Sequence, residues 1–141
     1  MLGTLLSQIS LVLVLTGCLT ALLIGGPRER LGGAAYLTTF GLQAGLYYVG
    51  LTAPGINPGL DGALLIALVA LCWKSPHPWP VWALGFQLIA VMIPIVRLSD
   101  PRIQGWAYYT AMTLSGYVVL LAIVTGAFIA RKRRKGLKSQ K

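Results

Sequence analysis

The polar side chains that lie within long apolar stretches are the residues of this sequence best placed to do chemistry. Three of them stand out: Gln43, Asp61 and Gln87. An amide or carboxyl group in an apolar interior is costly unless it is hydrogen-bonded, because no water is present to pair with it. We therefore expect the two glutamines either to hydrogen-bond between helices or to contact a substrate or pigment.

Asp61 is the only acidic residue within an apolar run, and it has three interpretations. It stands in the predicted first turn of a helix, where a carboxylate favours the positive helix end. A salt bridge to Arg97 or Arg102 and a proton or cation site are the alternatives. Asp100 lies between those two arginines, so Arg97, Asp100 and Arg102 are predicted to form a charged cluster that a partner protein would contact.

The residues of known catalytic and metal sites are scarce in this chain. Its single histidine, His77, lies between two prolines, and its cysteines, Cys18 and Cys72, fall in apolar runs. A metal site needs three or four grouped ligands, and His77 is interpreted as a solvated loop residue rather than a haem or pigment ligand. No catalytic triad, carboxylate pair or phosphate-binding loop can be drawn. We predict a protein that is not an enzyme and holds no cofactor or metal.

The elements that position these residues are predicted to be helices in a membrane. Apolar residues make up 56% of the chain and charged residues 11%, whereas soluble domains carry about 25% charged residues. A soluble domain of this size needs charge to cover its large surface, and lipid removes that need. The composition therefore indicates an integral membrane protein.

Five stretches approach the length of about 20 mainly apolar residues that a membrane helix needs: 4–24, 34–51, 58–73, 81–96 and 105–130. The predicted fold is all-α, a polytopic bundle of five transmembrane helices over residues 1–130, followed by a basic cytoplasmic tail, 131–141. The third stretch spans only about 24 Å at 1.5 Å per residue, so a re-entrant segment, and four spanning helices, is the alternative. No Lys or Arg precedes the first stretch, so we expect a retained helix rather than a signal peptide.

The connections between these stretches carry their own signals. The sequence Arg28-Glu29-Arg30 reads as a polar connector before the second helix. Asn57 is predicted to cap the third helix, with Pro58 at its first position. The three prolines within 74–80 predict an irregular connection.

Lysine and arginine counts predict the orientation, because cytoplasmic loops are enriched in these residues. With five spans, ten lie on the side of the tail and two on the other side. The N-terminus is thus predicted outside and the C-terminus in the cytoplasm of a bacterial inner membrane. Tryptophan and tyrosine favour headgroup depth, and they gather at both predicted surfaces: Trp73, Trp79, Trp82 and Tyr36 inside, and Tyr47, Tyr48, Trp106, Tyr108 and Tyr109 outside.

Small residues recur every four positions within four of the apolar stretches. Such seams let helix backbones approach closely in a membrane. We expect them to pack the bundle internally, with self-association or docking onto another complex as the alternative. The residues are Gly17, Ala21, Gly41, Gly45, Ala63, Ala67, Ala122 and Gly126.

Seven of the twelve lysines and arginines lie within residues 131–141. Positive charge beside the last helix fixes topology and attracts anionic lipid. No aromatic residue lies among these charges to stack on bases, so no nucleic-acid partner is expected. The tail is interpreted as a topological anchor.

The stretch 79–88, WPVWALGFQL, together with Asp100-Pro101 and Trp106-Ala107-Tyr108, resembles a group of short, uncharacterised membrane proteins of alphaproteobacteria. The resemblance covers residues 20–125 and implies a multi-span topology. It brings no functional residues.

The expected function is that of a non-catalytic accessory or assembly subunit of a larger membrane complex, for which an energy-transducing complex is one option. The predicted partners are lipid and other membrane subunits or a second copy of the chain. The first alternative is a small oligomeric transporter or channel, with Gln43, Asp61 and Gln87 along its pathway. The second is a membrane regulator or small-ligand binder.

Overall fold

The computed structural model describes residues 2–51, 55–73 and 75–140 of the chain. These residues form five helices and no strand: α1 (Leu2–Ile24), α2 (Pro27–Val49), α3 (Ile56–Cys72), α4 (Trp79–Ser99) and α5 (Gly105–Ser139). The predicted all-α architecture is confirmed for the described residues.

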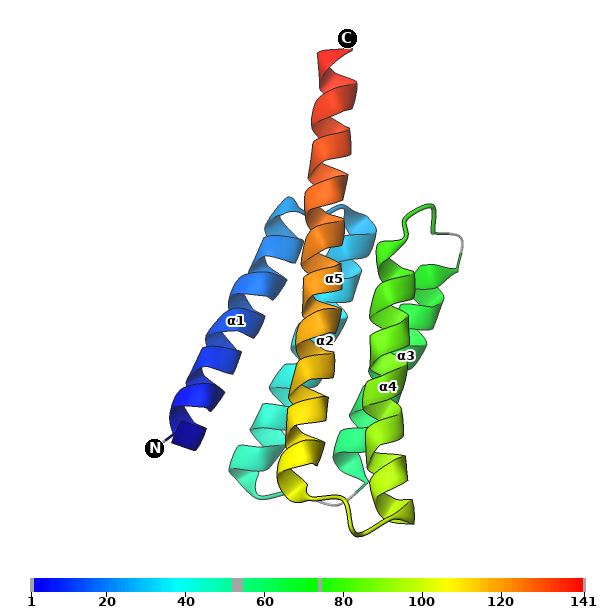
Figure 1. Ribbon diagram of the computed structural model, residues 1–141. Helices are drawn as coiled ribbons and strands as arrows, with labels where there is room; N and C mark the ends of the chain where they lie inside the picture. Colours follow the sequence, from blue (N-terminus) through cyan, green and yellow to red (C-terminus); the bar gives the residue numbers. More distant parts are fainter. Residues whose placement is uncertain (1, 52–54, 74, 141) are drawn as a thin grey trace.

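The helices run alternately up and down (Figure 1). Helices α2, α3, α4 and α5 form a ring in which each contacts its neighbours, and α1 packs against α2 and α5. Helix α5 extends well beyond the other four at one end of the bundle, which we call the tail end (Figure 1). The opposite end, where α1 begins, is called the N-terminal end.

Three of the described helices are long and apolar enough to cross a membrane: α1 over Thr4–Ile24, α4 and α5. Helix α3 is apolar but has 17 residues, and α2 carries Arg28, Glu29 and Arg30 in its first turns. The outward surfaces of the bundle expose many large apolar side chains, as expected for helices that face lipid. The described residues thus have the character of a membrane protein.

Helix boundaries differ from the predicted ones at three connections. Helix α2 begins at Pro27, not at residue 34, because proline suits the first helical turn and Arg28-Glu29-Arg30 continue the helix. Helix α3 is capped by Gly55, so the prediction that Asn57 caps it was wrong. The connection at 75–78 is irregular as predicted, but α4 starts at Trp79, inside the predicted connection. Residues 52–54 and Lys74, also assigned to connections, lie outside the described residues.

Three of the eight predicted seam residues, Gly17, Ala21 and Gly126, are closely packed inside the bundle toward its tail end. A Cβ atom on Gly17 would come within 2.8 Å of the Leu120 side chain, and one on Gly126 within 2.5 Å of the Trp79 ring. Ala21 is fully buried. At these positions the absence of a larger side chain lets the helices come together.

The remaining seam residues pack less closely or face outward. Ala67 and Ala122 are partly buried, whereas Ala63 is exposed. Nothing within the described residues lies within 4 Å of a Cβ placed on Gly41 or Gly45. The seam of α2 is therefore not used to pack this bundle.

Two of the aromatic residues predicted at headgroup depth are buried inside the bundle. Trp79 is 4% exposed and Tyr36 is also buried. Each polar group has found a partner within the bundle, since Trp79 donates to Glu29 and Tyr36 to the carbonyl of Gly116. The other aromatic residues predicted at the surfaces are exposed or, for Tyr108, partly buried: Trp73, Trp82, Tyr47, Tyr48, Trp106 and Tyr109 are the exposed ones.

Candidate functional site

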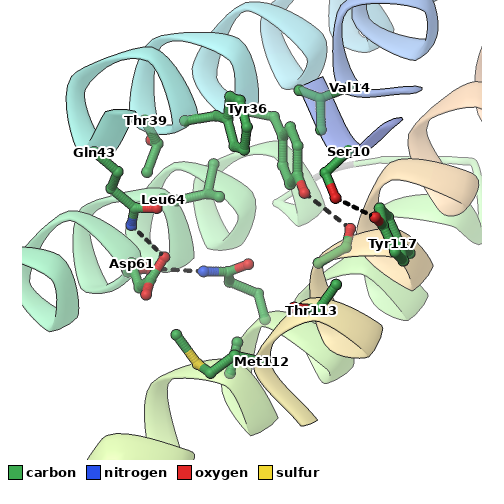
Figure 2. Close-up of a pocket in the computed structure, with 14 residues that line it drawn as sticks. Ser10, Val14, Tyr36, Thr39, Gln43, Asp61, Leu64, Met112, Thr113 and Tyr117 are labelled. Atoms are coloured by element: carbon green, nitrogen blue, oxygen red, sulfur yellow. Dashed lines mark hydrogen bonds between the residues drawn. The ribbon is translucent and has the colours of Figure 1, made fainter. Parts of the chain in front are cut away.

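A pocket of about 240 Å³ lies among the helices, and side chains from all five helices line it. Its walls include Ser10 of α1, Gln43 of α2, Asp61 of α3, Gln87 of α4 and Thr113 of α5. Figure 2 shows these walls with the hydrogen bonds that cross between helices. The fold thus brings together the three polar residues that the sequence singled out.

Asp61 is the charged residue of this pocket. Helix α3 begins at Ile56, so Asp61 lies beyond its first turn, and the predicted first-turn position near the surface was wrong. The side chain is 8% exposed. Gln43 donates from Nε2 to Asp61 Oδ1 at 3.0 Å, and the second carboxylate oxygen, Oδ2, is buried with no hydrogen-bond partner among the described residues.

Gln87 holds the opposite side of Asp61 in place. Its Nε2 donates to the backbone carbonyl of Asp61 at 3.2 Å, and the side chain is buried. Together the two glutamines connect α2 and α4 to the same residue of α3 (Figure 2). Both make helix-to-helix hydrogen bonds, which is the first of the two roles expected for them, and both also line the pocket.

Hydroxyl groups form the wall facing α1 and α5. Tyr36 donates to the carbonyl of Gly116 at 2.9 Å, and the hydroxyls of Ser10 and Tyr117 share a hydrogen bond (Figure 2). A Cβ on Gly116 would lie 3.2 Å from the Tyr36 oxygen, so glycine leaves space for this contact. No periodic signal in the sequence pointed to Ser10 or Tyr117, because a single hydroxyl in an apolar helix commonly bonds its own backbone.

The pocket has more acceptors than positive groups to satisfy them. Among the described residues that line it, Asp61 is the only acid, and there is no Lys, Arg or His. No group of three or more His, Cys, Asp or Glu residues lies together in the described part of the chain. The pocket is therefore suited to a ligand that donates hydrogen bonds or carries positive charge, and a multi-ligand metal centre does not fit it.

An apolar layer lies next to the pocket toward the tail end. Cys18, Leu68, Val119 and Ile123 are fully buried there, and they belong to one continuous hydrophobic cluster. The cluster continues from Tyr36 and Leu64 at the pocket to Trp79.

A second buried carboxylate lies beyond this layer. Glu29 is 3% exposed, and its Oε1 accepts a hydrogen bond of 3.0 Å from Trp79 Nε1. A Cβ on Gly26 would come within 2.7 Å of Glu29 Oε2, so the adjacent glycine gives the carboxylate room. The sequence placed Glu29 in a connector and missed this contact, although the glycines beside it were a usable signal.

The predicted charged cluster at the N-terminal end is arranged differently. The Arg97 guanidinium lies 4.5 Å from the centre of the Tyr108 ring. Asp100 accepts a hydrogen bond of 3.0 Å from the backbone amide of Arg102. The Asp61 carboxylate bonds Gln43 rather than either arginine. His77, expected to be solvated, is partly buried, and its Nδ1 has no hydrogen-bond partner among the described residues.

Comparisons of this chain with known protein families, with curated proteins and with solved structures give no significant match. The interpretation of the site therefore depends on its geometry.

Proposed function

We propose that this chain is a five-span membrane protein that binds a small cationic or hydrogen-bond-donating molecule in the pocket around Asp61. The observation that carries the proposal is the buried carboxylate oxygen Oδ2 of Asp61, which has no hydrogen-bond partner within residues 2–51, 55–73 and 75–140, in a pocket that all five helices line. A buried acceptor without a partner is costly, and a ligand donor or cation at this place removes that cost.

Five spans require α2 and α3 to cross the bilayer as well. Helix α3 is continuous over 17 residues, which corresponds to about 26 Å, and a locally thinned bilayer accommodates that length. It runs antiparallel to both neighbours (Figure 1). With this topology and ten of twelve lysines and arginines on the tail side, we place the C-terminus in the bacterial cytoplasm. A reporter fusion at Gly55 tests this, and a cytoplasmic location there would refute five spans.

The surroundings of Asp61 favour an organic ammonium ion over a metal ion. Divalent calcium takes six or more oxygen ligands, whereas a primary or quaternary ammonium is satisfied by one carboxylate and nearby aromatic faces. Tyr36, Phe40 and Tyr117 line the same pocket. The volume of about 240 Å³ limits the ligand to a small molecule.

Binding is tested with the full chain in lipid nanodiscs and a panel of small ammonium compounds. A ligand at 100 times its Kd stabilises the folded protein by about 2.7 kcal/mol, which a thermal unfolding assay detects. Asp61→Asn should abolish this stabilisation, and Asp100→Asn, an exposed acid outside the pocket, should retain it. Equal binding by Asp61→Asn and the unchanged protein would refute the site.

The apolar layer favours a binding protein over an open channel. Fully buried Cys18, Leu68 and Ile123 separate the pocket from the tail end, so a polar molecule that enters the pocket meets no continuous polar path. Transport would need a rearrangement of this layer. Flux of a bound ammonium compound into proteoliposomes distinguishes a transporter from a receptor or regulator.

An accessory or assembly subunit is the second candidate, and the open seam of α2 favours it. Gly41 and Gly45 lie on one face with nothing within 4 Å of a Cβ on either, so a helix of another chain can approach that backbone closely. Purification in mild detergent, followed by mass spectrometry of the bound proteins, tests this. Stoichiometric recovery with one larger complex supports it, and clean monomers contradict it.

A further inference from the structure

A basic notch lies at the tail end of the bundle, far from the Asp61 pocket. Its volume is about 360 Å³, and its lining residues come from the end of α1 and the extension of α5: Leu23, Ile24, Arg131, Arg134, Lys135 and Lys138. Helix α5 continues without interruption through these residues to Ser139. The tail is thus an ordered helical wall of a site over this length.

Four of the tail cations share one helix face. Arg131, Arg134, Lys135 and Lys138 follow the spacing i, i+3, i+4, i+7, which in an α-helix places them within an arc of about 100°. Lys132 and Arg133 fall outside that arc and do not line the notch. A pair of cations inside the notch and the pair Lys132 and Arg133 outside it therefore carry the same charge and differ in position.

Arg134 fixes the basic face against α1. Its guanidinium donates a hydrogen bond to the backbone carbonyl of Ile24, the last residue of α1. Carbonyls at a helix C-terminus lack partners within the helix, and a cation there also favours the negative helix end. This contact holds the notch at the level where the apolar surface of α1 ends.

Apolar and cationic groups meet at the notch. Leu23 is 76% exposed beside the four cations, and the neighbouring turns of α1 expose further leucines that continue toward the N-terminal end. A free phosphate ion would use the cations alone. A phospholipid uses both parts, with its phosphate on the cations and its acyl chains along α1.

We infer that this notch binds the headgroup phosphate of an anionic phospholipid. The inference does not depend on the Asp61 pocket or its ligand. Lysine and arginine near an anionic membrane surface each strengthen binding, and guanidinium groups bind phosphate oxygens through paired hydrogen bonds. The position of the cations, and not their number alone, decides the binding.

The test uses the full chain in nanodiscs of phosphatidylcholine with a minor fraction of phosphatidylglycerol. The protein is released from the nanodiscs into the gas phase, and native mass spectrometry measures the lipid that stays bound to it. The double variant Arg134→Gln with Lys138→Gln should bind phosphatidylglycerol about 30-fold more weakly than the unchanged protein, and retain correspondingly less of it. The double variant Lys132→Gln with Arg133→Gln removes the same charge and should retain it at nearly the unchanged level.

The other outcomes are equally decisive. Equal losses in both double variants would mean general attraction of charge to the membrane, and would overturn the notch as a site. Displacement of the lipid by millimolar glycerol phosphate would identify a site for soluble phosphates instead. Preferential retention of a short RNA over phosphatidylglycerol would assign the basic face to nucleic acid and overturn the lipid assignment.

Discussion

The two buried carboxylates of this bundle are held in contrasting ways. Glu29, near the tail end, accepts a hydrogen bond from Trp79 and sits among close-packed glycines. Asp61, on the other side of the apolar layer, borders a pocket, and one of its oxygens has no partner in the described part of the chain. The first carboxylate is part of a tight interhelical joint, and the second borders open space.

The contrast extends to the surroundings of each carboxylate. Around Glu29, the ring of Trp79 fills the space that Gly32 and Gly126 leave, and a Cβ on either glycine would overlap it. Around Asp61, glutamines and hydroxyl groups replace close apolar contacts. Close apolar packing thus surrounds Glu29, whereas hydrogen-bonded polar side chains and a pocket surround Asp61.

The largest change in unfolding free energy should come from Trp79→Ala, which disrupts the close packing around Glu29. The substitution removes a buried ring and leaves Glu29 without its donor, and truncation of buried tryptophan costs about 3–5 kcal/mol. Reversible unfolding in mixed micelles measures the loss. Trp82→Ala is the control, because Trp82 is 65% exposed and should cost far less. Equal losses for the two variants would contradict the claim that the contact between Trp79 and Glu29 stabilises the bundle.

A smaller effect is expected from Gly126→Ala. The new Cβ would lie 2.5 Å from the Trp79 ring, and overpacking of this kind costs about 1–3 kcal/mol, partly offset by the better helix propensity of alanine. The matched variant is Gly41→Ala, whose Cβ meets nothing within 4 Å, and it should leave stability unchanged or raise it slightly. The same unfolding assay compares them, and destabilisation by Gly41→Ala alone would reverse the assignment of the two seams.

Asp61→Asn should have little effect on stability and a large effect on binding. The amide keeps the shape of the carboxylate and an oxygen that can accept from Gln43, so we expect a change in unfolding free energy below about 1 kcal/mol. Ammonium-dependent stabilisation should disappear. A loss of stability as large as that of Trp79→Ala would show that Asp61 holds the helices together as Glu29 does. The two carboxylates would then not differ in role.

The smallest effect is expected from Gln43→Leu. Hydrogen bonds between membrane helices contribute about 0.6 kcal/mol on average, so the unfolding free energy should fall by about that amount. Ligand affinity should change as well, because Asp61 Oδ1 loses its donor and its orientation is less restricted. Unchanged affinity in the nanodisc assay would indicate that Gln43 contributes only to helix packing and not to ligand binding.

Much of the fold could be predicted from the sequence, because apolar stretches and their breaks are local signals. The irregular connection at 75–78 and the five helices follow from them. The start of α2 at Pro27 follows a local signal that the prediction did not use. The burial of Glu29 could not be predicted, since this residue reads as a polar connector until its partner Trp79 is known. That pairing joins residues far apart in the chain, and hydropathy carries no information about it.

The candidate site could be predicted in part, because single polar residues within apolar stretches are also local signals. Gln43, Asp61 and Gln87 were recognisable individually, because polar groups in apolar stretches need partners. The contacts of both glutamines with Asp61, and the addition of Tyr36 to the pocket, depend on how α2, α3 and α4 are rotated about their axes. The burial of Tyr36 and Trp79 inside the bundle was not predicted, because amphipathic rings suit buried sites that offer an acceptor as well as membrane surfaces.

Because α5 is one continuous helix, a tilt at one end displaces its other end. Tyr117 lines the pocket and Lys138 lines the basic notch, and no proline interrupts the helix between them. These residues lie about 30 Å apart along the axis, so a tilt of about 5° at the pocket displaces the far end by about 2.6 Å. A molecule bound to the cationic end of α5 would therefore oppose tilting of the helix at the Asp61 pocket. Conversely, tilting at the pocket would displace that bound molecule.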